Sequence, residues 1–209
     1  MTDNLKSFKF TKKADKAISE KGWEVLEGVV INALAGNDII KGTSSTDSGI
    51  GNYGTINTGD GKDTITGTGT GDFYGIGNDG TINTGAGNDI IKGTGTGYGI
   101  LNTGTINTGA GNDIVDALEG GFDGDGTTYL DAGNDTLKGF GTGNFYGGAG
   151  TDKLFFGEGT YVISGSTVVF NGATMNVNQF EKIGGANGGL FTFQDGTLTV
   201  SSTGVGTFA

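Results

Sequence analysis

The chain has 209 residues, of which 46 are glycine and none is proline, cysteine or histidine. The absence of cysteine and histidine excludes thiolate and imidazole metal sites, a cysteine nucleophile and a Ser/His/Asp triad. The net charge is −11, the basic residues are all lysine, and most of the acidic excess follows residue 28. Such a chain repels phosphate backbones, so we expect cations rather than nucleic acid as partners.

Residues 1–28 differ from the rest of the chain, because they hold six lysines and the only tryptophan, Trp23. The pattern predicts a helix over 11–21 that ends at Gly22. We interpret 1–28 as an N-terminal cap on the first coil of a solenoid, with a loose tail as the alternative. The segment lacks the apolar stretch of a cleaved secretory signal, and no apolar run in the chain is long enough to span a bilayer.

Residues 29–119 contain an internal repeat, Thr-Ile-Asn-Thr-Gly-Xaa-Gly-Xaa-Asp-Xaa-Ile, with its clearest copies starting at Thr55, Thr81 and Thr105. Each interval holds three aliphatic residues separated by glycine turns. A disordered glycine-rich tract would not return an aliphatic residue to a constant register, whereas a stacked solenoid needs one for each strand. The sequence therefore predicts an all-β, right-handed parallel β-solenoid with three-sided coils of about 24–26 residues. In the second and third coils the expected core residues are Ile56, Ile65, Ile76, Ile82, Ile91 and Ile100.

Three asparagines recur on the third strand of these coils: Asn52, Asn78 and Asn102. Stacked at the strand spacing of about 4.8 Å, each amide would donate to the carbonyl of the next amide. The alternative is that asparagine merely tolerates left-handed turns here. The sequence leaves both interpretations open.

After Gly120 the polar turn residues come closer together, at Asp125, Asp135, Asn144 and Asp152. This spacing predicts that 120–156 forms a two-sided β-roll. Residues 157–209 lose the period, and we expect them to form a C-terminal β cap. Its predicted strands are 160–163, 167–170, 191–193 and 197–200.

An aspartate ends the glycine turn of every repeat, which indicates a metal site. Stacked carboxylates repel one another, and a divalent cation would relieve that repulsion. Calcium takes six to eight oxygen ligands, and glycines allow peptide carbonyls to join carboxylates as ligands. The candidate ligands are the turn aspartates and their glycines, together with one further aspartate of the 120–156 segment: Asp38, Asp63, Asp89, Asp113, Asp135, Asp152, Gly59, Gly61, Gly85, Gly87, Gly109, Gly111, Gly148, Gly150 and Asp125.

The unit at 84–92, TGAGNDIIK, resembles the calcium-binding nonapeptide of the repeats-in-toxin (RTX) family, Gly-Gly-Xaa-Gly-Xaa-Asp-Xaa-Φ-Xaa, where Φ is a large aliphatic residue. The unit at 147–155, GGAGTDKLF, matches it at every position. The resemblance implies a parallel β-roll that binds several calcium ions, up to about five if every gap between neighbouring turns is filled. It also implies an extracellular protein exported by type I secretion, with an uncleaved C-terminal signal that would lie within 188–209. Two turns depart further from the pattern: one reads Ala33-Leu34-Ala35, and the other has Asp131 in place of a glycine and has lost a residue.

These features lead us to expect a secreted, calcium-dependent β-solenoid with a structural or adhesive role. One alternative is an ice- or carbohydrate-binding surface formed by rows of threonine, with ice or cell-surface polysaccharide as partner. The rows are Thr55, Thr81 and Thr105, and Thr58, Thr84 and Thr108. Another alternative is a polysaccharide-modifying enzyme or a module of one. Its candidate acids would be Asp116, Glu119, Asp123 and Asp131, but the sequence shows no paired acid and base among them.

Overall fold

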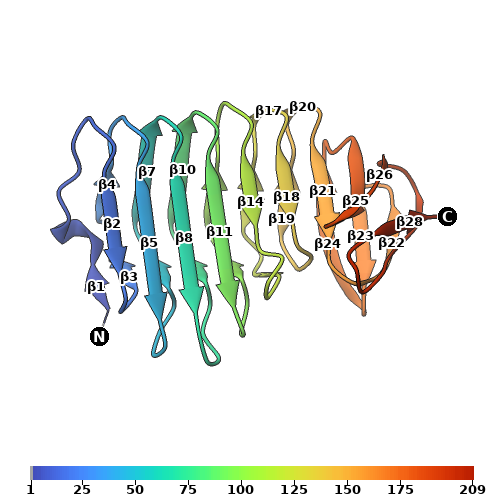
Figure 1. Ribbon diagram of the computed structural model, residues 1–209, viewed down its shortest axis with the longest axis horizontal. Coiled ribbons are helices and arrows are strands. Elements are labelled where there is room, and N and C mark those ends of the chain that lie inside the picture. The colour runs from blue at the N-terminus through green and yellow to red at the C-terminus, as the bar shows by residue number, and fades with distance from the viewer. Residues whose placement is uncertain (1) are drawn as a thin grey trace.

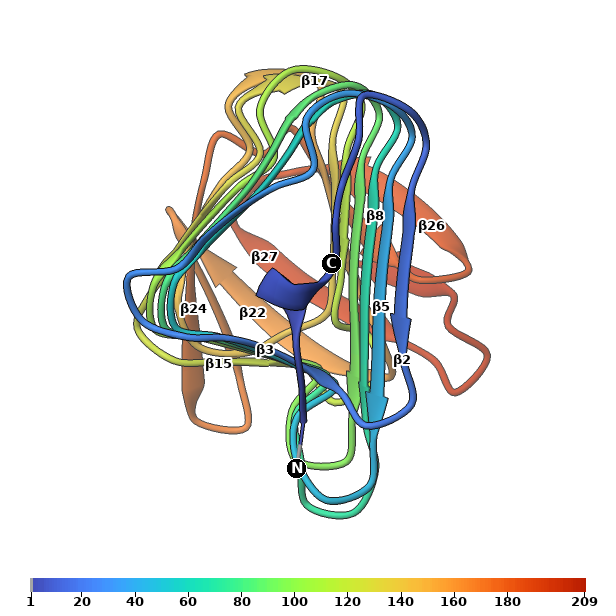
Figure 2. The same ribbon diagram turned by 90° about the vertical axis from the view of Figure 1, so that its left-hand side faces the viewer.

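The computed structural model describes residues 2–209 as a parallel β-solenoid of about seven turns, closed at its C-terminal end by antiparallel strands. The coils stack along the long axis, with the two termini at opposite ends (Figure 1). Viewed from the N-terminal end, the stacked strands enclose three sides of a common core (Figure 2). Each side is one sheet, so the predicted all-β solenoid is confirmed.

We name the three sides sheets A, B and C. Sheet A has six strands: β1 (Asp3–Asn4), β3 (Trp23–Val25), β6 (Ile50–Asn52), β9 (Ile76–Asn78), β12 (Ile100–Asn102) and β15 (Phe122–Asp123). Sheet B has nine: β2 (Lys16–Ser19), β5 (Ile39–Ser44), β8 (Thr64–Gly69), β11 (Ile90–Gly95), β14 (Ile114–Asp116), β18 (Thr136–Lys138), β21 (Lys153–Phe156), β25 (Lys182–Gly185) and β26 (Gly188–Thr192).

Sheet C has eleven strands and includes most of the C-terminal cap. They are β4 (Val30–Asn32), β7 (Thr55–Asp60), β10 (Thr81–Ala86), β13 (Thr105–Asn107), β16 (Thr127–Tyr129), β19 (Asn144–Tyr146), β22 (Gly159–Ser164), β23 (Thr167–Phe170), β24 (Ala173–Asn178), β27 (Gly196–Val200) and β28 (Gly206–Phe208). A separate pair, β17 (Ala132–Gly133) and β20 (Ala149–Gly150), lies at the corner between sheets C and B.

The repeated aliphatic residues fill the interior, because alternate side chains of a strand point to opposite faces. Ile56 and Ile82 pair in sheet C, Ile65 and Ile91 pair in sheet B, and all four are fully buried. The two expected core residues of sheet A, Ile76 and Ile100, are also fully buried. The periodicity therefore predicted the register of the core correctly.

The three asparagines form the predicted ladder, which we call the Asn ladder (Asn52, Asn78 and Asn102). The side-chain amide of Asn52 donates to Asn78 Oδ1 at 2.7 Å, and that of Asn78 donates to Asn102 Oδ1 at 2.8 Å. All three side chains are buried, and none of these residues has a positive φ. The ladder interpretation is thus confirmed over the left-handed-turn interpretation.

The predicted N-terminal helix is wrong. Residues 16–19 form strand β2, which pairs in parallel with β5, and residues 23–25 form β3 of sheet A. The only helical element in the described residues is the three-residue 3-10 helix η1 (Leu5–Ser7), whose Leu5 is fully buried. Ala17 and Ser19 point inward and complete the first coil, so pairing with the next coil overrides the weak helical pattern.

The predicted two-sided roll is wrong only for the first coil after Gly120. The coils do shorten, but β15, β16 and β18 still place this segment on all three sheets. In the following coil, sheet A is reduced to a single bridge between Phe122 and Gly141. The third side is thus nearly lost one coil later than predicted. Glycine-rich corners can lose residues without changing the register of the strands.

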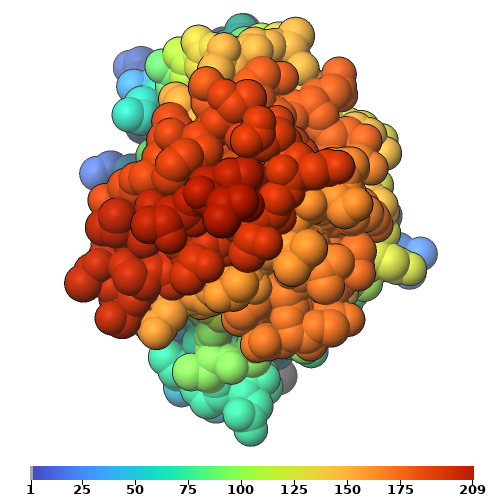
Figure 3. All heavy atoms as spheres, turned by 90° about the vertical axis from the view of Figure 1, so that its right-hand side faces the viewer, coloured from blue at the N-terminus to red at the C-terminus, as the bar shows by residue number. Residues whose placement is uncertain are grey.

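The C-terminal cap contains the strands expected around 160–200, but it also extends the solenoid. β24 pairs in parallel with β19, and β25 pairs in parallel with β21. One more partial coil therefore lies, in space, between the regular coils and the antiparallel strands. Phe156 stacks on Tyr161, with ring centroids 4.3 Å apart, where the last coil meets the cap. The C-terminal residues spread over this end of the molecule (Figure 3).

Candidate metal site

The turn aspartates lie in one line at the corner where sheet C passes into sheet B, near β17 and β20 in Figure 1. We call this line the Asp column: Asp38, Asp63, Asp89, Asp113, Asp135 and Asp152. Each residue directly follows a glycine turn and precedes a strand of sheet B. Parallel stacking of the coils therefore superimposes the turns as well as the strands.

Two glycines of each regular turn allow this stacking. Gly85 and Gly87 have φ angles of 100° and 144°, a range that other residues seldom adopt. A Cβ atom on Gly87 would lie 1.6 Å from the carbonyl oxygen of Gly61 in the previous coil. The same left-handed backbone recurs at the other predicted turn glycines: Gly59, Gly61, Gly109, Gly111, Gly148 and Gly150. Glycine is thus required at these positions by both backbone angle and close contact between coils.

Successive members of the Asp column are joined by hydrogen bonds from backbone to side chain. The backbone N–H of Asp63 donates to Asp89 Oδ1 at 2.7 Å, and that of Asp89 donates to Asp113 Oδ1 at 2.7 Å. The same bond joins Asp38 to Asp63, Asp113 to Asp135 and Asp135 to Asp152, at 2.7–2.8 Å. One oxygen of each carboxylate is therefore fixed by the preceding coil.

The second oxygen of each carboxylate has no partner. The Oδ2 atoms of all six aspartates are buried and accept no hydrogen bond within the described chain, and each residue is at most 1% exposed. Leaving a buried polar atom unpaired costs about 1–3 kcal/mol, and more when the group is charged. Six such atoms in one line need a neutralising partner.

Burial raises the pKa values of five aspartates of the Asp column. The pKa of Asp113 rises to about 6 and that of Asp135 to about 7, mainly through burial and further through neighbouring carboxylates. The backbone hydrogen bonds and, at Asp113, the nearby Thr108 hydroxyl act in the opposite direction. Burial also raises the pKa values of Asp38, Asp89 and Asp152. The folded chain therefore opposes ionisation of these carboxyls in the absence of a cation.

The donor set suits a hard cation such as calcium, which binds carboxylate and carbonyl oxygens. Among residues 2–209, no three acidic side chains converge on a single point. A cation in the Asp column would therefore need backbone carbonyls as well as the unpaired Oδ2 atoms. The carbonyls of Gly61, Gly87 and Gly111 accept no hydrogen bond from the described residues, so they are available for this role.

Two residues that the sequence analysis missed extend the line at its ends. The backbone N–H of Asp15 donates to Asp38 Oδ1, and the N–H of Asp152 donates to Glu181 Oε2, both at 2.7 Å. Glu181 thus stands where the next aspartate would be, since Lys153 pairs with Lys182. The sequence held a signal for it, because Glu181 precedes the buried Ile183 by two residues, just as Asp152 precedes Leu154.

Asp125 and Asp131 lie outside the Asp column. Asp125 is exposed at the corner between sheets A and C, where its carbonyl accepts a bond from the side chain of Asn144. Asp131 occupies a glycine position with a φ of 66°, and Leu34 does the same in the first turn with a φ of 82°. The turn before Asp135 has not lost a residue, because Ala132 and Gly133 pair in register with their counterparts in the next coil.

The two threonine rows differ in exposure. Thr58, Thr84 and Thr108 are buried, and the hydroxyl of each donates to a carbonyl of the next coil at 2.9 Å. Thr55, Thr81 and Thr105 remain partly exposed on the outer face of sheet C. Only the row of Thr55, Thr81 and Thr105 can therefore meet an external surface.

The candidate catalytic acids are dispersed. Asp116 lies 3.9 Å from Lys138, and Glu119 lies 4.0 Å from Lys92. The carboxylate of Asp123 accepts a bond from the hydroxyl of Thr142. Each of the three side chains therefore belongs to a separate pair, and the three do not form one site.

Comparison of the chain with protein-family models, with curated proteins and with solved structures gives no match. In the part of the chain that the structure describes, no helix is long and apolar enough to cross a membrane. The geometry of the site is therefore the basis for a functional assignment.

Proposed function

We propose that the Asp column binds several calcium ions and that this binding stabilises the fold, as the resemblance to RTX repeats implies. The observation that carries the proposal is the line of six buried carboxylate oxygens without a hydrogen-bond partner. A calcium ion between neighbouring turns would neutralise two carboxylates and use the free glycine carbonyls. A ligand that binds only the folded chain stabilises it by mass action, so the calcium concentration would control folding.

Extracellular calcium modules have dissociation constants of about 10⁻⁴–10⁻³ M, which suits folding outside the cell better than sensing within it. We therefore propose a secreted protein with a structural or adhesive role, exported as an unfolded chain by a type I system. The RTX-like turns and the scarcity of lysine after residue 28 support this proposal. Export is tested by locating a tagged full-length chain in cells and medium, with and without residues 188–209.

Calcium binding is tested directly by equilibrium dialysis and circular dichroism. We expect several bound ions per chain, up to about five between the six aspartates, and a β-rich spectrum that is lost at neutral pH in excess chelator. Equal melting temperatures in chelator and in millimolar calcium would contradict the proposal. Magnesium is the control ion, because it retains its water shell and demands a tighter octahedral geometry.

A second candidate function is recognition of ice or a polysaccharide by the outer face of sheet C. The observation that favours it is a regular array of partly exposed Thr55, Thr81 and Thr105, next to asparagines whose side chains bond to one another at 2.8 Å. Ice-growth inhibition by the calcium-loaded protein tests this candidate. Substitution Thr81→Tyr should abolish the inhibition, whereas the same change at Thr66 on sheet B should not.

A further inference from the structure

A groove crosses the outer face of sheet A, the side of the solenoid that does not meet the Asp column. It encloses a volume of about 320 Å³. Its floor contains Gly51 and Gly77, which pair with each other at outward-facing positions of β6 and β9. A Cβ atom at either glycine would have no neighbour closer than 3.6 Å. The hollow therefore exists because two neighbouring strands present bare backbone.

Aromatic rings form part of the walls. Tyr53, Phe73 and Tyr74 line the groove, and Tyr53 is 50% exposed. Tyr74 also stacks on Tyr98 of the next coil, with ring centroids 6.0 Å apart. Partly exposed rings of this kind offer flat apolar faces for aliphatic groups and for cations.

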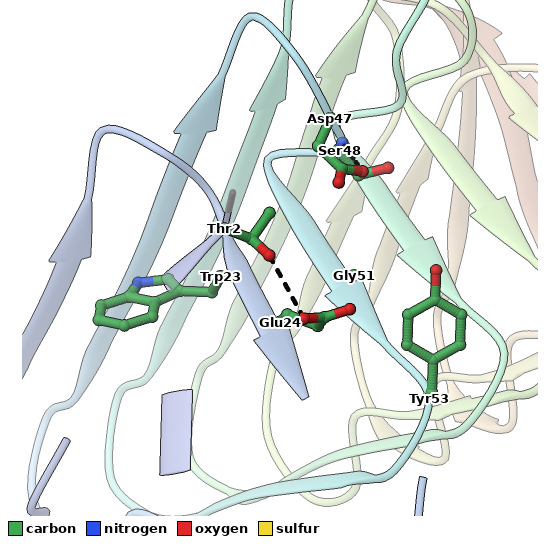
Figure 4. Close-up of a pocket in the computed structure, with 7 residues that line it drawn as sticks. All are labelled: Thr2, Trp23, Glu24, Asp47, Ser48, Gly51 and Tyr53. Atoms are coloured by element: carbon green, nitrogen blue, oxygen red, sulfur yellow. Dashed lines mark hydrogen bonds between the residues drawn. The ribbon is translucent and has the colours of Figure 1, made fainter. Parts of the chain in front are cut away.

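The charged side chains of the groove are all acidic. Asp47, Asp72 and Asp79 line it, and Glu24 lies in the adjoining hollow shown in Figure 4, beside Gly51 and Tyr53. No lysine lines either part. Burial, followed by the charges of Asp79, Asp47 and Glu24, raises the pKa of Tyr53, as expected for a negative field.

The carboxylates are spread along the groove rather than gathered. Asp47 and Asp72 lie on loops of successive coils, and within residues 2–209 no three acids are close enough to hold one metal ion. A single metal ion is thus a poor occupant. An elongated ligand with several separated positive charges matches both the shape and the charge of the groove.

We propose that this groove binds a linear polyamine, an aliphatic chain that carries several ammonium groups. The ammonium groups would donate to the carboxylates, and the methylene segments would lie on the tyrosine rings over the glycine floor. A neutral sugar chain would leave the acidic side chains uncompensated, so the charge of the lining favours the polyamine. The proposal is independent of the calcium site.

The test is isothermal titration of the calcium-saturated full-length protein with spermidine, since excess calcium keeps the ligand out of the Asp column. Gly77→Trp fills the groove without changing the net charge, so it separates binding in the groove from general attraction to an acidic protein. Thr66→Trp, on the outer face of sheet B, is the matched control. We expect affinity to fall at least about tenfold in Gly77→Trp, which is about 1.4 kcal/mol, and to be unchanged in Thr66→Trp.

Circular dichroism in calcium verifies that the variants fold. If Gly77→Trp does not fold, the exposed Tyr53→Ala replaces it, with the same expected loss of affinity. Equal spermidine affinity in wild type and in the folded groove variant would overturn the proposal. Binding of maltohexaose that is lost in the groove variant, without spermidine binding, would also overturn it and make the groove a sugar site.

Discussion

Acidification should stabilise the calcium-free protein, because protons would relieve the same buried charge as the proposed calcium ions. One pKa unit corresponds to about 1.4 kcal/mol. The rise of the pKa of Asp113 from 3.8 to about 6 is therefore worth about 3 kcal/mol, and that of Asp135 to about 7 is worth about 4 kcal/mol. Both side chains are at most 1% exposed, but their charges are coupled, so we expect a combined effect of several kcal/mol.

The direction follows from proton linkage. The folded protein retains protons on these carboxyls at pH values where the unfolded chain has lost them, so the free energy of unfolding decreases as pH rises from 3.8 to about 7. In saturating calcium the dependence should reverse over the acidic range, because protons then compete with the metal. The two stability curves should therefore cross.

The assay is urea unfolding of calcium-stripped protein at a series of acidic pH values, at which the calcium-free chain is expected to stay folded. Unfolding is followed by the fluorescence of Trp23, which is 6% exposed. Asp113→Asn should reduce the change in stability with pH by about 3 kcal/mol. Asp125→Asn, the same substitution outside the Asp column, should leave it unchanged. A stability of the calcium-free protein that is flat or increases with pH would refute the reasoning.

Three further substitutions test the turns, the C-terminal end of the Asp column and the core. Gly87→Ala should lower the free energy of unfolding in urea by more than about 3 kcal/mol, because the new Cβ would overlap the carbonyl of Gly61. The control Gly51→Ala, whose Cβ has space, should change it by less than about 1 kcal/mol. Glu181→Gln should lower the number of calcium ions bound in equilibrium dialysis and speed hydrogen exchange in β25. The control Glu158→Gln, at an exposed position, should do neither. An unchanged ion count in Glu181→Gln would show that Glu181 is not part of the site. Asn78→Leu should cost about 2–3 kcal/mol, because it leaves neighbouring buried amide and carbonyl groups unpaired.

The repeat predicted the solenoid core and the alignment of the turns well, because both depend on local periodicity. Ile65 and Asp63 recur with the same offset in each coil, so stacking one coil on the next places both correctly. The Asn ladder was one of two interpretations that the same spacing left open. These features need only the spacing of residues and the distance between strands.

Other features depend on contacts that the sequence pattern does not encode. Residues 16–19 become a strand because β5 offers them an edge, and that pairing outweighs a helical pattern rich in lysine. Glu181 joins the line through the register of β25, well beyond the last recognisable repeat. Asp125 matched a two-sided period, but the third side of the solenoid persists there and places it at a different corner.

The groove could not have been predicted, because it arises from an absence of side chains. Gly51 and Gly77 lie on the predicted third strand, but nothing in the sequence marks them as the floor of a groove. Only the parallel register places one directly beside the other and leaves a hollow between the flanking loops.

The hydrogen bonds of the Asp column keep nearly constant lengths of 2.7–2.8 Å, although they join residues 25, 26, 24, 22 and 17 positions apart. Differences in coil length are thus absorbed away from the Asp column, including in the loops between sheets B and A at 45–49, 70–75 and 96–99. Evolution, or a protein engineer, can change those loops one coil at a time while the Asp column stays as it is.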